Sequence, residues 1–426
     1  MSALAQHYLS KGHEVSGSDL AASEITDFLK HKGIKINIGN LTPGTKHPAP
    51  DLIVYSPAVK QDNPELKYYT EKGIRCLSYP KALGEITKQY FTIAVAGSHG
   101  KSTTTAMIGL LLEKAGFDPT VIVGTKIREF QNNNFRAGKG PYLVIEACEY
   151  EDSFLHYFPK IIVITNIDKE HLDYFKNYKN VLNSFKKFLG NLQKDGHAML
   201  CADDKGVLKL KIKESEKFQF YSLKQKGAKK IKKLLKVPGS HNVLNALAVL
   251  AAARILRIPD EVSLKSLSEF AGTWRRFEIK TAELDNGRKI TIISDYGHHP
   301  TEISATLKAV REKYPKKRIW CVFQPHQKQR TYYLFNDFVK TFRSAPVDNV
   351  IVTDIYDVAG REEKGISGKI NSEKLVKKIG KKSVKYLSAE EIETFLKKNP
   401  RLGGIKSGDV LVIMGAGDIY KLADRF

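Results

Sequence analysis

The segment FTIAVAGSHGKSTTT, residues 91–105, constrains the architecture of this chain more than any other. An apolar run typical of a buried parallel strand leads into a turn with two glycines, and a threonine-rich helical segment follows. In such a strand-turn-helix unit the free N–H groups at the start of the helix point into the turn, where they bind phosphate. The segment therefore predicts an α/β fold with a phosphate site at this strand end.

The turn itself carries the groups that a nucleotide site needs. Gly97 and Gly100 let backbone N–H groups approach phosphate oxygens, Lys101 can reach the outer phosphates, and Ser102 can ligate Mg²⁺. Val95 stands at the first glycine of a strict Walker A motif, and a glycine-rich turn at a strand end is often only a turn. We take strand, turn and helix together as a prediction of nucleotide binding.

Helical and strand patterns alternate on both sides of this segment in three blocks. Residues 1–88 have a doubly wound α/β pattern, although the chain opens on a helix where a βαβ unit would have its first strand and loop. Residues 89–276 contain apolar strands at 91–97, 142–147 and 160–167, and residues 277–426 repeat the alternation. The sequence thus predicts three α/β domains: an incomplete Rossmann-like domain, a central P-loop-like domain and a second Rossmann-like domain.

Composition narrows the class of protein. The chain has 426 residues, 42% of them hydrophobic, and a net charge of +23 that comes mainly from lysines spread along its length. Scattered lysines are more typical of solvated faces or an anionic substrate than of a nucleic-acid site. The four cysteines have no metal-ligand spacing, and no apolar run is long enough for a membrane. We expect a soluble cytoplasmic protein that binds no nucleic acid and inserts into no membrane.

Polar residues follow two further strands of the central block. Glu146 ends one strand, and a carboxylate there suits Mg²⁺. Asn166, Asp168, His171 and Asp173 follow the next. His171 read alone is better explained as a surface or hydrogen-bonded histidine, because imidazole is an unusual Mg²⁺ ligand.

Two motifs near the end of the central block have both a binding and a structural interpretation. Asn242 and Asn245 lie on one helix face beside His241, where amides could read adenine, although asparagine at a helix start is usually a cap. Arg275 and Arg276 could clamp phosphate or form salt bridges with neighbours.

Histidines and an arginine follow successive strands of the third block. His298 and His299 come after one strand, and His326 and Arg330 come after the next, so the four should converge in one crevice. Such a set suits a substrate that bears a carboxylate.

Eight ordered motifs resemble those of the Mur ligases of peptidoglycan synthesis, over nearly the whole chain. They are AGSHGKSTTTAM, EACEYEDSFLH, TNIDKEHLDYF, PGSHNVLNA, GTWRRFE, SDYGHHPTEI, FQPH and MGAGDIY. The resemblance implies three domains, for a UDP-sugar, ATP and an amino acid. It also implies a reaction in which ATP phosphorylates the lactyl carboxylate of UDP-N-acetylmuramate and L-alanine attacks the acyl phosphate.

The resemblance implies individual roles in ATP and metal binding. Ser102 and Glu146 would hold one Mg²⁺, His171 would hold a second, and Arg276 would meet the γ-phosphate, so that Lys101, Glu146, His171 and Arg276 form the catalytic set. The implied triphosphate loop consists of Gly97, Ser98, His99, Gly100, Lys101, Ser102 and Thr103. The remaining ATP contacts are His241, Asn242 and Asn245 at the adenine and Asp295 at the ribose.

The resemblance also places the other two substrates. Tyr296, His298, His326 and Arg330 would surround L-alanine, with Gln327 where the family often has an arginine. Ser18 and Asp19 would contribute to the UDP-sugar site. Because the expected first strand and loop are missing, through a start set too late or a truncation, we expect weak UDP-sugar binding beside intact ATP binding.

Three alternatives stay open at this point. One is a ligase that recycles a murein tripeptide onto the same UDP-sugar, and another is a degenerate relative that binds ATP without ligase activity. A basic nucleic-acid-binding P-loop protein is the third, but it leaves the histidine motifs unexplained.

Overall fold

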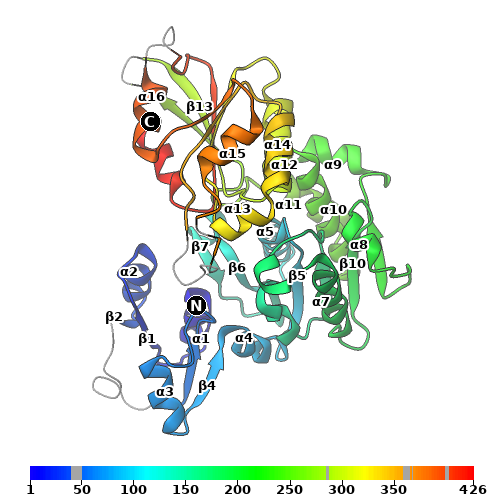
Figure 1. Ribbon diagram of the computed structural model, residues 1–426. Coiled ribbons are helices and arrows are strands. Elements are labelled where there is room, and N and C mark those ends of the chain that lie inside the picture. The colour runs from blue at the N-terminus through cyan, green and yellow to red at the C-terminus, as the bar shows by residue number, and fades with distance from the viewer. Residues whose placement is uncertain (40–49, 285–286, 358–364, 367, 399–402) are drawn as a thin grey trace. The chain divides into compact units, whose positions relative to one another are not determined.

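The computed structural model of the chain describes residues 1–39, 50–284, 287–357, 365–366, 368–398 and 403–426 (Figure 1). They form two compact units, and each is described by itself. Unit 1 consists of Met1–Ile167, Leu182–Phe220 and Ala251–Val262, and unit 2 of Asp168–Val181, Tyr221–Leu250 and Ser263–Phe426. The three predicted domain ranges, 1–88, 89–276 and 277–426, stay predictions.

A seven-stranded sheet with the order β11-β10-β9-β5-β8-β6-β7 contains the apolar strand of residues 91–105 as β5. Its strands are β5 (Phe91–Ala96), β6 (Thr120–Ile127), β7 (Asn133–Arg136), β8 (Tyr142–Glu146), β9 (Ile161–Ile164), β10 (His197–Cys201) and β11 (Phe218–Tyr221). β5 pairs in parallel with both β8 and β9, and Ile93, Ala94 and Val95 are completely buried. The apolar runs at 91–97, 142–147 and 160–167 are therefore the buried parallel strands that the sequence predicts.

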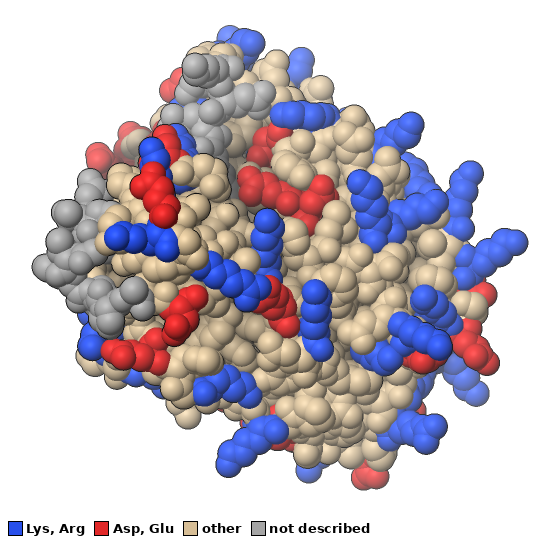
Figure 2. All heavy atoms as spheres, turned by 90° about the horizontal axis from the view of Figure 1, so that it is seen from below, with Lys and Arg blue, Asp and Glu red and all other residues tan. Residues whose placement is uncertain are grey.

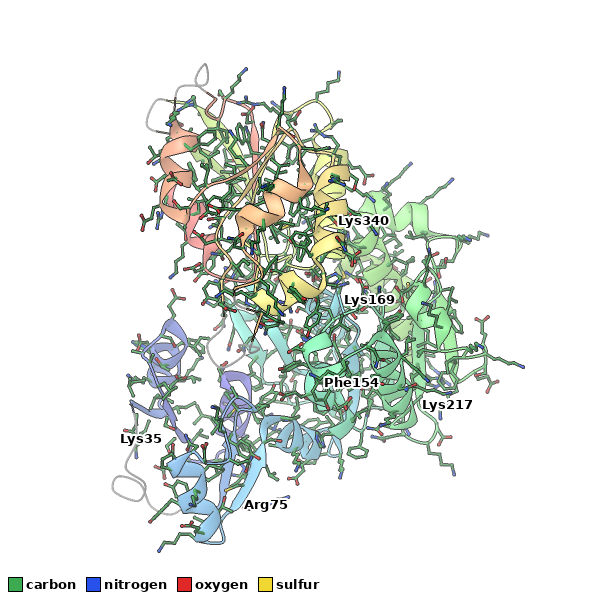
Figure 3. The ribbon with its side chains drawn as sticks, in the orientation of Figure 1. Lys35, Arg75, Phe154, Lys169, Lys217 and Lys340 are labelled. Carbon is green, nitrogen blue, oxygen red and sulfur yellow. The ribbon has the colours of Figure 1, made fainter. Side chains whose placement is uncertain are left out.

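Helices pack against this sheet and fix the segments around the strand ends. α5 (Lys101–Lys114) packs on β5, β6 and β8, and the 3₁₀ helix η2 (Tyr150–His156) contacts α4 (Tyr79–Thr87). Phe154 of η2, labelled in Figure 3, is completely buried and stacks on Phe188 with 4.5 Å between ring centroids. This packing anchors the turn that follows β8. Further helices that lie wholly or partly in unit 1 include η1 (Arg128–Phe130), α7 (Tyr178–Gly190), α8 (Lys205–Lys209) and α10 (Ser240–Ile255).

The N-terminal region contains the predicted elements but not one continuous sheet. Its elements are α1 (Ser2–Ser10), β1 (Ser16–Asp19), α2 (Glu24–His31), β2 (Lys35–Ile38), β3 (Leu52–Tyr55), α3 (Pro64–Glu71) and β4 (Arg75–Ser78). β1 pairs only with β2 and β3 only with β4, both in parallel, and no strand among the described residues joins the pairs. The strands predicted for residues 1–88 are thus present, but as two separate pairs. One continuous sheet would need a further strand that is hydrogen-bonded to both pairs.

The residues predicted for the UDP-sugar lie in and at the end of β1. The Ser18 hydroxyl donates to Glu65 at 2.8 Å, and the Asp19 carboxylate accepts from the backbone N–H of Ala21 at 3.4 Å. Both lie at the carboxyl end of a parallel strand, where ligands bind in such sheets. Their role in sugar binding stays a prediction.

Hydrogen bonds and buried rings hold α1 in unit 1. The side chains of Gln6 and Asn133 exchange hydrogen bonds of 3.2 and 2.6 Å. His7 is 3% exposed, and its ring meets the rings of Tyr90 and Phe135 edge-on. Burial, and secondarily Lys11, lowers the pKa of His7 from 6.5 to about 4. The imidazole is therefore neutral in the folded protein at neutral pH.

Replacement of His7 by phenylalanine is expected to flatten the acid side of the stability profile. Between pH 6.5 and pH 4 the unfolded chain binds a proton at His7 and the folded chain does not. The free energy of unfolding is therefore unaffected by this group above pH 6.5 and falls as the pH is lowered towards 4. The loss is on the order of 3 kcal/mol. Urea unfolding of both proteins at pH 7 and at pH 4.5 measures it. An equal loss of stability in the wild type and the variant would contradict the prediction.

Unit 2 is built on a six-stranded sheet with the order β12-β13-β17-β14-β15-β16. The strands are β12 (Glu278–Glu283), β13 (Lys289–Asp295), β14 (Ile319–Phe323), β15 (Asn349–Val352), β16 (Val384–Tyr386) and β17 (Val410–Met414). β12 is antiparallel to β13, and the other neighbours are parallel. Alternate residues face opposite sides, so Cys321 and Phe323 enter one core while Trp320 and Val322 enter the other.

Helices cover both faces of this sheet, as a doubly wound fold requires. α12 (Pro300–Lys313), α14 (Phe335–Ser344) and α15 (Ser372–Ile379) contribute to one core, and α16 (Ala389–Lys397) and η4 (Ile419–Arg425) to the other. The sequence pattern of the third block predicts this arrangement. The remaining helices of unit 2 are α6 (Leu172–Phe175), α9 (Ala228–Leu234), α11 (Asp260–Glu269) and α13 (Lys328–Tyr333).

The surface agrees with the interpretation of the charge. On the face seen in Figure 2, lysine and arginine side chains are scattered, and acidic side chains lie among them. Every helix that the structure describes is too short or too polar to span a bilayer.

Candidate functional site

The predicted phosphate loop lies at the carboxyl end of β5, between the ends of β8 and β9. Gly97 has φ +137°, and a Cβ there would lie 2.0 Å from the Thr165 hydroxyl, so only glycine fits. Gly100 has φ +82° and is the N-cap of α5. Two glycines thus bring the backbone to the start of a helix, which is the geometry of an anion site.

Side chains at the end of β9 hold this loop in place. The Asn166 amide accepts from the backbone N–H of His99 at 2.8 Å and donates to the His99 carbonyl at 2.9 Å. The Thr165 hydroxyl donates to the same carbonyl at 2.6 Å. Asn166, predicted as a polar residue at this sheet edge, therefore holds the loop through hydrogen bonds to the backbone. Thr165 does the same, and the sequence analysis missed it.

Lys101 points back over the loop toward a buried carboxylate. Its ammonium group donates to Glu149 at 2.9 Å, to the Ser98 carbonyl at 3.1 Å and to the Gly97 carbonyl. Burial lowers the pKa of Lys101, but Glu149 outweighs this and raises it, so the ammonium stays charged. The Glu149 side chain is 0% exposed. The sequence analysis missed Glu149, although an acidic residue shortly after a strand end that faces a lysine loop was a usable signal.

Glu146 lies where the strand pairing predicts, beside the phosphate loop. It is opposite Val95 in the pairing of β8 with β5, and its carboxylate accepts from the backbone N–H of Gly124 at 2.7 Å. Ser102 and Thr103 lie in the first turn of α5 and are 5% and 8% exposed. The sheet thus brings a carboxylate and hydroxyl groups to the same edge.

Four predicted residues of unit 2 form one continuous cluster. The rings of Tyr296 and His298 have centroids 5.5 Å apart, and those of His298 and His326 are 5.7 Å apart. Arg330 donates to Nδ1 of His326 at 3.0 Å, which fixes the tautomer with Nδ1 unprotonated, because guanidinium cannot accept. Tyr356 stacks on His326 at 5.7 Å and is a neighbour that the sequence analysis missed.

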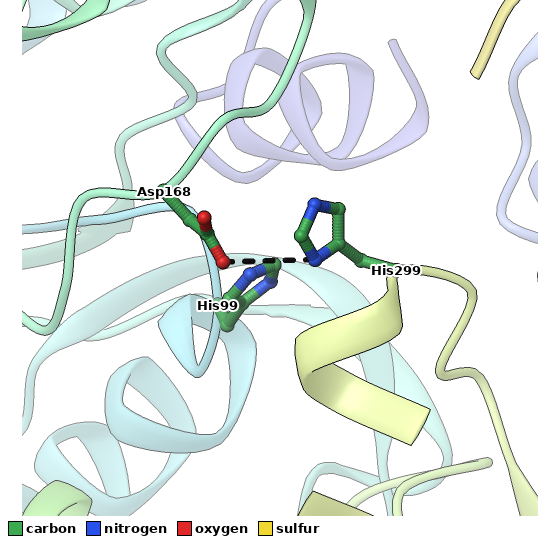
Figure 4. A group of neighbouring side chains, drawn as sticks. All are labelled: His99, Asp168 and His299. Atoms are coloured by element: carbon green, nitrogen blue, oxygen red, sulfur yellow. Dashed lines mark ion pairs between the residues drawn. The ribbon is translucent and has the colours of Figure 1, made fainter. Parts of the chain in front are cut away.

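His299 was predicted beside His298, but it faces another way. It is the N-cap of α12, is 3% exposed, and has its Nδ1 3.6 Å from the Asp168 carboxylate (Figure 4). The Thr301 hydroxyl donates to the same carboxylate at 2.6 Å. Consecutive residues at the end of a strand point in different directions, so His299 ties the segment of Asp168 to α12 instead of joining the cluster.

Glu302 organises the histidine cluster and was also missed. Its carboxylate accepts from the backbone N–H groups of His298 and His299 at 3.0 and 3.2 Å, and it lies 3.7 Å from Arg276. The sequence HHPTE has the spacing of a capping box, which was the available signal. Burial, followed by Arg330, lowers the pKa of His298 to about 4 and outweighs Glu302, so His298 is neutral.

The two adjacent arginines have different environments. Arg275 is 4% exposed, donates to the carbonyls of Gly415 and Gly417, and lies 4.3 Å from the ring of Tyr420. Arg275 is thus buried and its Nη2 donates inside unit 2, which does not fit the interpretation of Arg275 as a phosphate clamp. Arg276 has a side chain that is 27% exposed and lies over Tyr296.

The residues predicted for adenosine lie at the start of α10 and the end of β13, where Asn242, Asn245 and Asp295 are buried and His241 is half-buried. Asn242 donates to the Pro238 carbonyl at 2.7 Å, and Asn245 donates to Asn242 at 3.4 Å. Burial lowers the pKa of neighbouring His241 to about 4. The Asp295 carboxylate accepts from the backbone N–H groups of Phe277 and Gly297 at 2.9 and 2.8 Å. Each of its two oxygens therefore already accepts a hydrogen bond from the backbone.

His171 occupies a strained backbone position next to a buried ion pair. It has φ +53° and is the N-cap of α6. The preceding Glu170 is 5% exposed and accepts from Arg330 at 3.3 Å. Burial raises the pKa of Glu170, but Arg330 more than offsets this and holds it well below its usual range.

Comparison with known proteins covers the whole chain. Residues 1–91 match the model "Mur ligase family, catalytic domain", residues 95–234 match "Mur ligase middle domain", and residues 275–417 match "Mur ligase, glutamate ligase domain". The three matches follow the order expected from the motifs.

The alignments with individual relatives cover nearly the full length of each protein. The UDP-N-acetylmuramate–L-alanine ligases of Clostridium tetani and Acetivibrio thermocellus are each 40% identical over 100% of this chain and 95% and 93% of their own. Among solved structures, the UDP-N-acetylmuramate-alanine ligase of Thermotoga maritima has a TM-score of 0.76 at 28% identity and covers 100% of this chain and 95% of its own. A murein peptide ligase of Psychrobacter arcticus has a TM-score of 0.68 at 23% identity, covers 100% of this chain and 95% of its own, and shares the fold.

Proposed function

The chain belongs to the Mur ligase family, and from that premise we propose that it is an ATP-dependent ligase that joins L-alanine to UDP-N-acetylmuramate. The observation that carries this proposal is the 40% identity, along the whole chain, to relatives named for that reaction. The reaction is amide-bond formation in the synthesis of peptidoglycan precursors.

The phosphate loop and Lys101 supply the groups for the first step. ATP transfers its γ-phosphoryl group to an oxygen of the lactyl carboxylate, ADP leaves, and an acyl phosphate forms. Negative charge moves between the phosphate oxygens during this transfer, so a preorganised ammonium group and helix N-terminus lower its barrier. The amine of L-alanine then attacks the acyl carbon, and phosphate departs as the amide forms and the amine loses its proton.

A magnesium ion fits the groups at the edge of the central sheet. The Glu146 carboxylate and the Ser102 hydroxyl are oxygen ligands of the kind that Mg²⁺ prefers, and we propose that they hold one ion. The ion would neutralise charge on the transferred phosphoryl group. The proposal for His171 as a ligand of a second ion rests on the family resemblance.

The cluster of unit 2 supplies a site for the amino acid. Tyr296 contacts His298, His298 contacts His326, and His326 accepts from Arg330. Arg330 carries the positive charge that an amino-acid carboxylate needs. His298 is neutral above about pH 4, so it adds no competing charge near the incoming amine.

An assay of phosphate release tests the proposed reaction and its rivals. The enzyme is given ATP, Mg²⁺ and UDP-N-acetylmuramate, and L-alanine, L-serine, glycine or a murein tripeptide is added in turn. We expect release with L-alanine and formation of the corresponding amide. Release with the tripeptide alone would favour the recycling ligase, and no release with any acceptor would reject the ligase function.

A change at Gly124 tests the role of Glu146 without altering any charge. In Gly124→Ala the new Cβ would lie 2.8 Å from the Glu146 carboxylate and displace it, so we expect the Mg²⁺ concentration for half-maximal activity to rise about tenfold. Gly190→Ala is the matched control, because nothing lies within 4 Å of a Cβ there. The same Mg²⁺ dependence in both variants would argue against Glu146 as a ligand.

A further inference from the structure

Glu170 is a buried charged residue to which neither the sequence motifs nor the proposed reaction assigns a role. Its side chain is 5% exposed, and that of Arg330 is 9% exposed, with 3.3 Å between Oε2 and Nη2. A pair that is withdrawn from water to this degree is costly to form, so its retention calls for a structural or functional reason.

The contacts of Arg330 define the orientation of its guanidinium group. Nη2 donates to Glu170, and Nη1 donates to both Nδ1 and the carbonyl oxygen of His326, at 3.0 and 3.2 Å. Because the guanidinium is planar and rigid, fixing two of its nitrogens fixes the third. Among the described residues these bonds use three of its five N–H groups, and the two that are left match the demand of one bidentate carboxylate.

Two neighbours of Arg330 in the sequence, Gln327 and Lys328, add no uncommitted positive charge. Gln327, where the family often has an arginine, is uncharged and 4% exposed. Lys328 pairs with Asp357 at 3.3 Å. Among Tyr296, His298, His326 and Arg330, only Arg330 has a side chain that is always positively charged, so we expect it to recognise the carboxylate.

The space beside Glu170 is small. The cavity beside it, which Arg330, Gln329 and Tyr333 also line, has a volume of about 20 Å³. That is room for about one water molecule and not for an amino acid. Because its side chain is only 5% exposed and contacts Arg330, we infer that Glu170 acts on a substrate through Arg330.

We propose that Glu170 is a positioning residue that holds Arg330 in the orientation that receives the carboxylate of L-alanine. This inference rests on the proposed function. Positioning and simple electrostatics predict opposite effects here. Removal of a negative charge beside Arg330 should tighten binding of an anionic substrate if charge alone matters, and should weaken it if orientation matters.

The test is the KM for each substrate in Glu170→Ala and Glu170→Gln. We expect the KM for L-alanine to rise about tenfold or more in Glu170→Ala and less in Glu170→Gln, which keeps an acceptor oxygen. The kcat, the KM for ATP and the Mg²⁺ dependence should stay within about twofold of the wild type. Asp357→Ala, which breaks the neighbouring ion pair on α13, is the matched control and should leave the KM for L-alanine unchanged.

Several results would overturn the inference. A KM for L-alanine that is unchanged or lower in both variants would show that orientation by Glu170 is unimportant. A parallel rise in the KM for ATP or in the Mg²⁺ requirement would assign Glu170 to the adjacent His171 or to general stability. An inactive wild-type enzyme would instead reject the proposed function, so the two failures are distinguishable. If Glu170→Ala does not fold, Glu170→Gln decides the question.

Discussion

Lys101→Ala is expected to lower ATP-dependent phosphate release about a thousandfold or more. The ammonium group of Lys101 lies over the loop that would hold the triphosphate and is the cation in the helix-start geometry that favours anions. Removal of a preorganised charge from a site of phosphoryl transfer costs a factor of this order. Steady-state kinetics with saturating ATP measure it, and activity within tenfold of the wild type would contradict the role of the loop.

The same substitution is expected to destabilise unit 1. A loss of activity could therefore come from unfolding as well as from the lost ammonium group. The carboxylate of Glu149 would be left buried without its partner, at a cost of about 3–5 kcal/mol. The double variant Lys101→Met with Glu149→Gln removes both charges at similar volume and should recover most of that stability. If its activity stays low while its urea midpoint returns to the wild-type value, the loss in Lys101→Ala is catalytic.

Arg275→Ala is expected to lower the free energy of unfolding of unit 2 by about 3–5 kcal/mol. The change leaves two carbonyl groups without their donor, at about 1–3 kcal/mol each, and removes the contact of the guanidinium with Tyr420 and Tyr296. Thermal and urea unfolding of the full chain measure the effect. The loss should exceed that of any ordinary surface substitution.

Arg276→Ala is the matched control for this prediction. Its side chain is more exposed and pairs only loosely with Glu302 at 3.7 Å, so stability should change by less than about 1 kcal/mol. If Arg276 meets the γ-phosphate, as the family resemblance implies, kcat should fall instead. Equal losses of stability in the two variants would contradict the assignment of Arg275 as an internal packing residue.

Local sequence patterns were sufficient to predict the helices and strands. They also predicted which strand ends carry the candidate site residues. The apolar run before Gly97 and the glycines themselves allow one arrangement of strand, turn and helix, because a left-handed residue at a strand end that abuts Thr165 accepts no Cβ. The carboxyl ends of the parallel strands of one sheet meet at one edge. Glu146 and Asn166 could therefore be placed at the edge of the seven-stranded sheet, and the histidine motifs at the edge of the six-stranded sheet, from strand order alone.

Long-range contacts decided which of these side chains serve the site and which serve the fold. Nothing local distinguishes Arg275 from Arg276, yet Arg275 is buried and donates to carbonyl groups distant in sequence. The capping-box spacing of HHPTE marks His299 as the start of a helix, but only the fold shows that it faces Asp168. Glu149 and Glu170 gained their importance only because folding buries each against a cation distant in sequence.

The sequence by itself therefore determined the α/β architecture, the strand-turn-helix unit at residues 91–105 and the family. The tertiary structure alone decided the separate strand pairs at the N-terminus, the partners of Lys101 and Arg330, and the structural role of Arg275. The physical reason is that periodicity and glycine geometry are properties of neighbouring residues. The pairing of a buried charge instead depends on which distant groups the finished fold removes from water together with it.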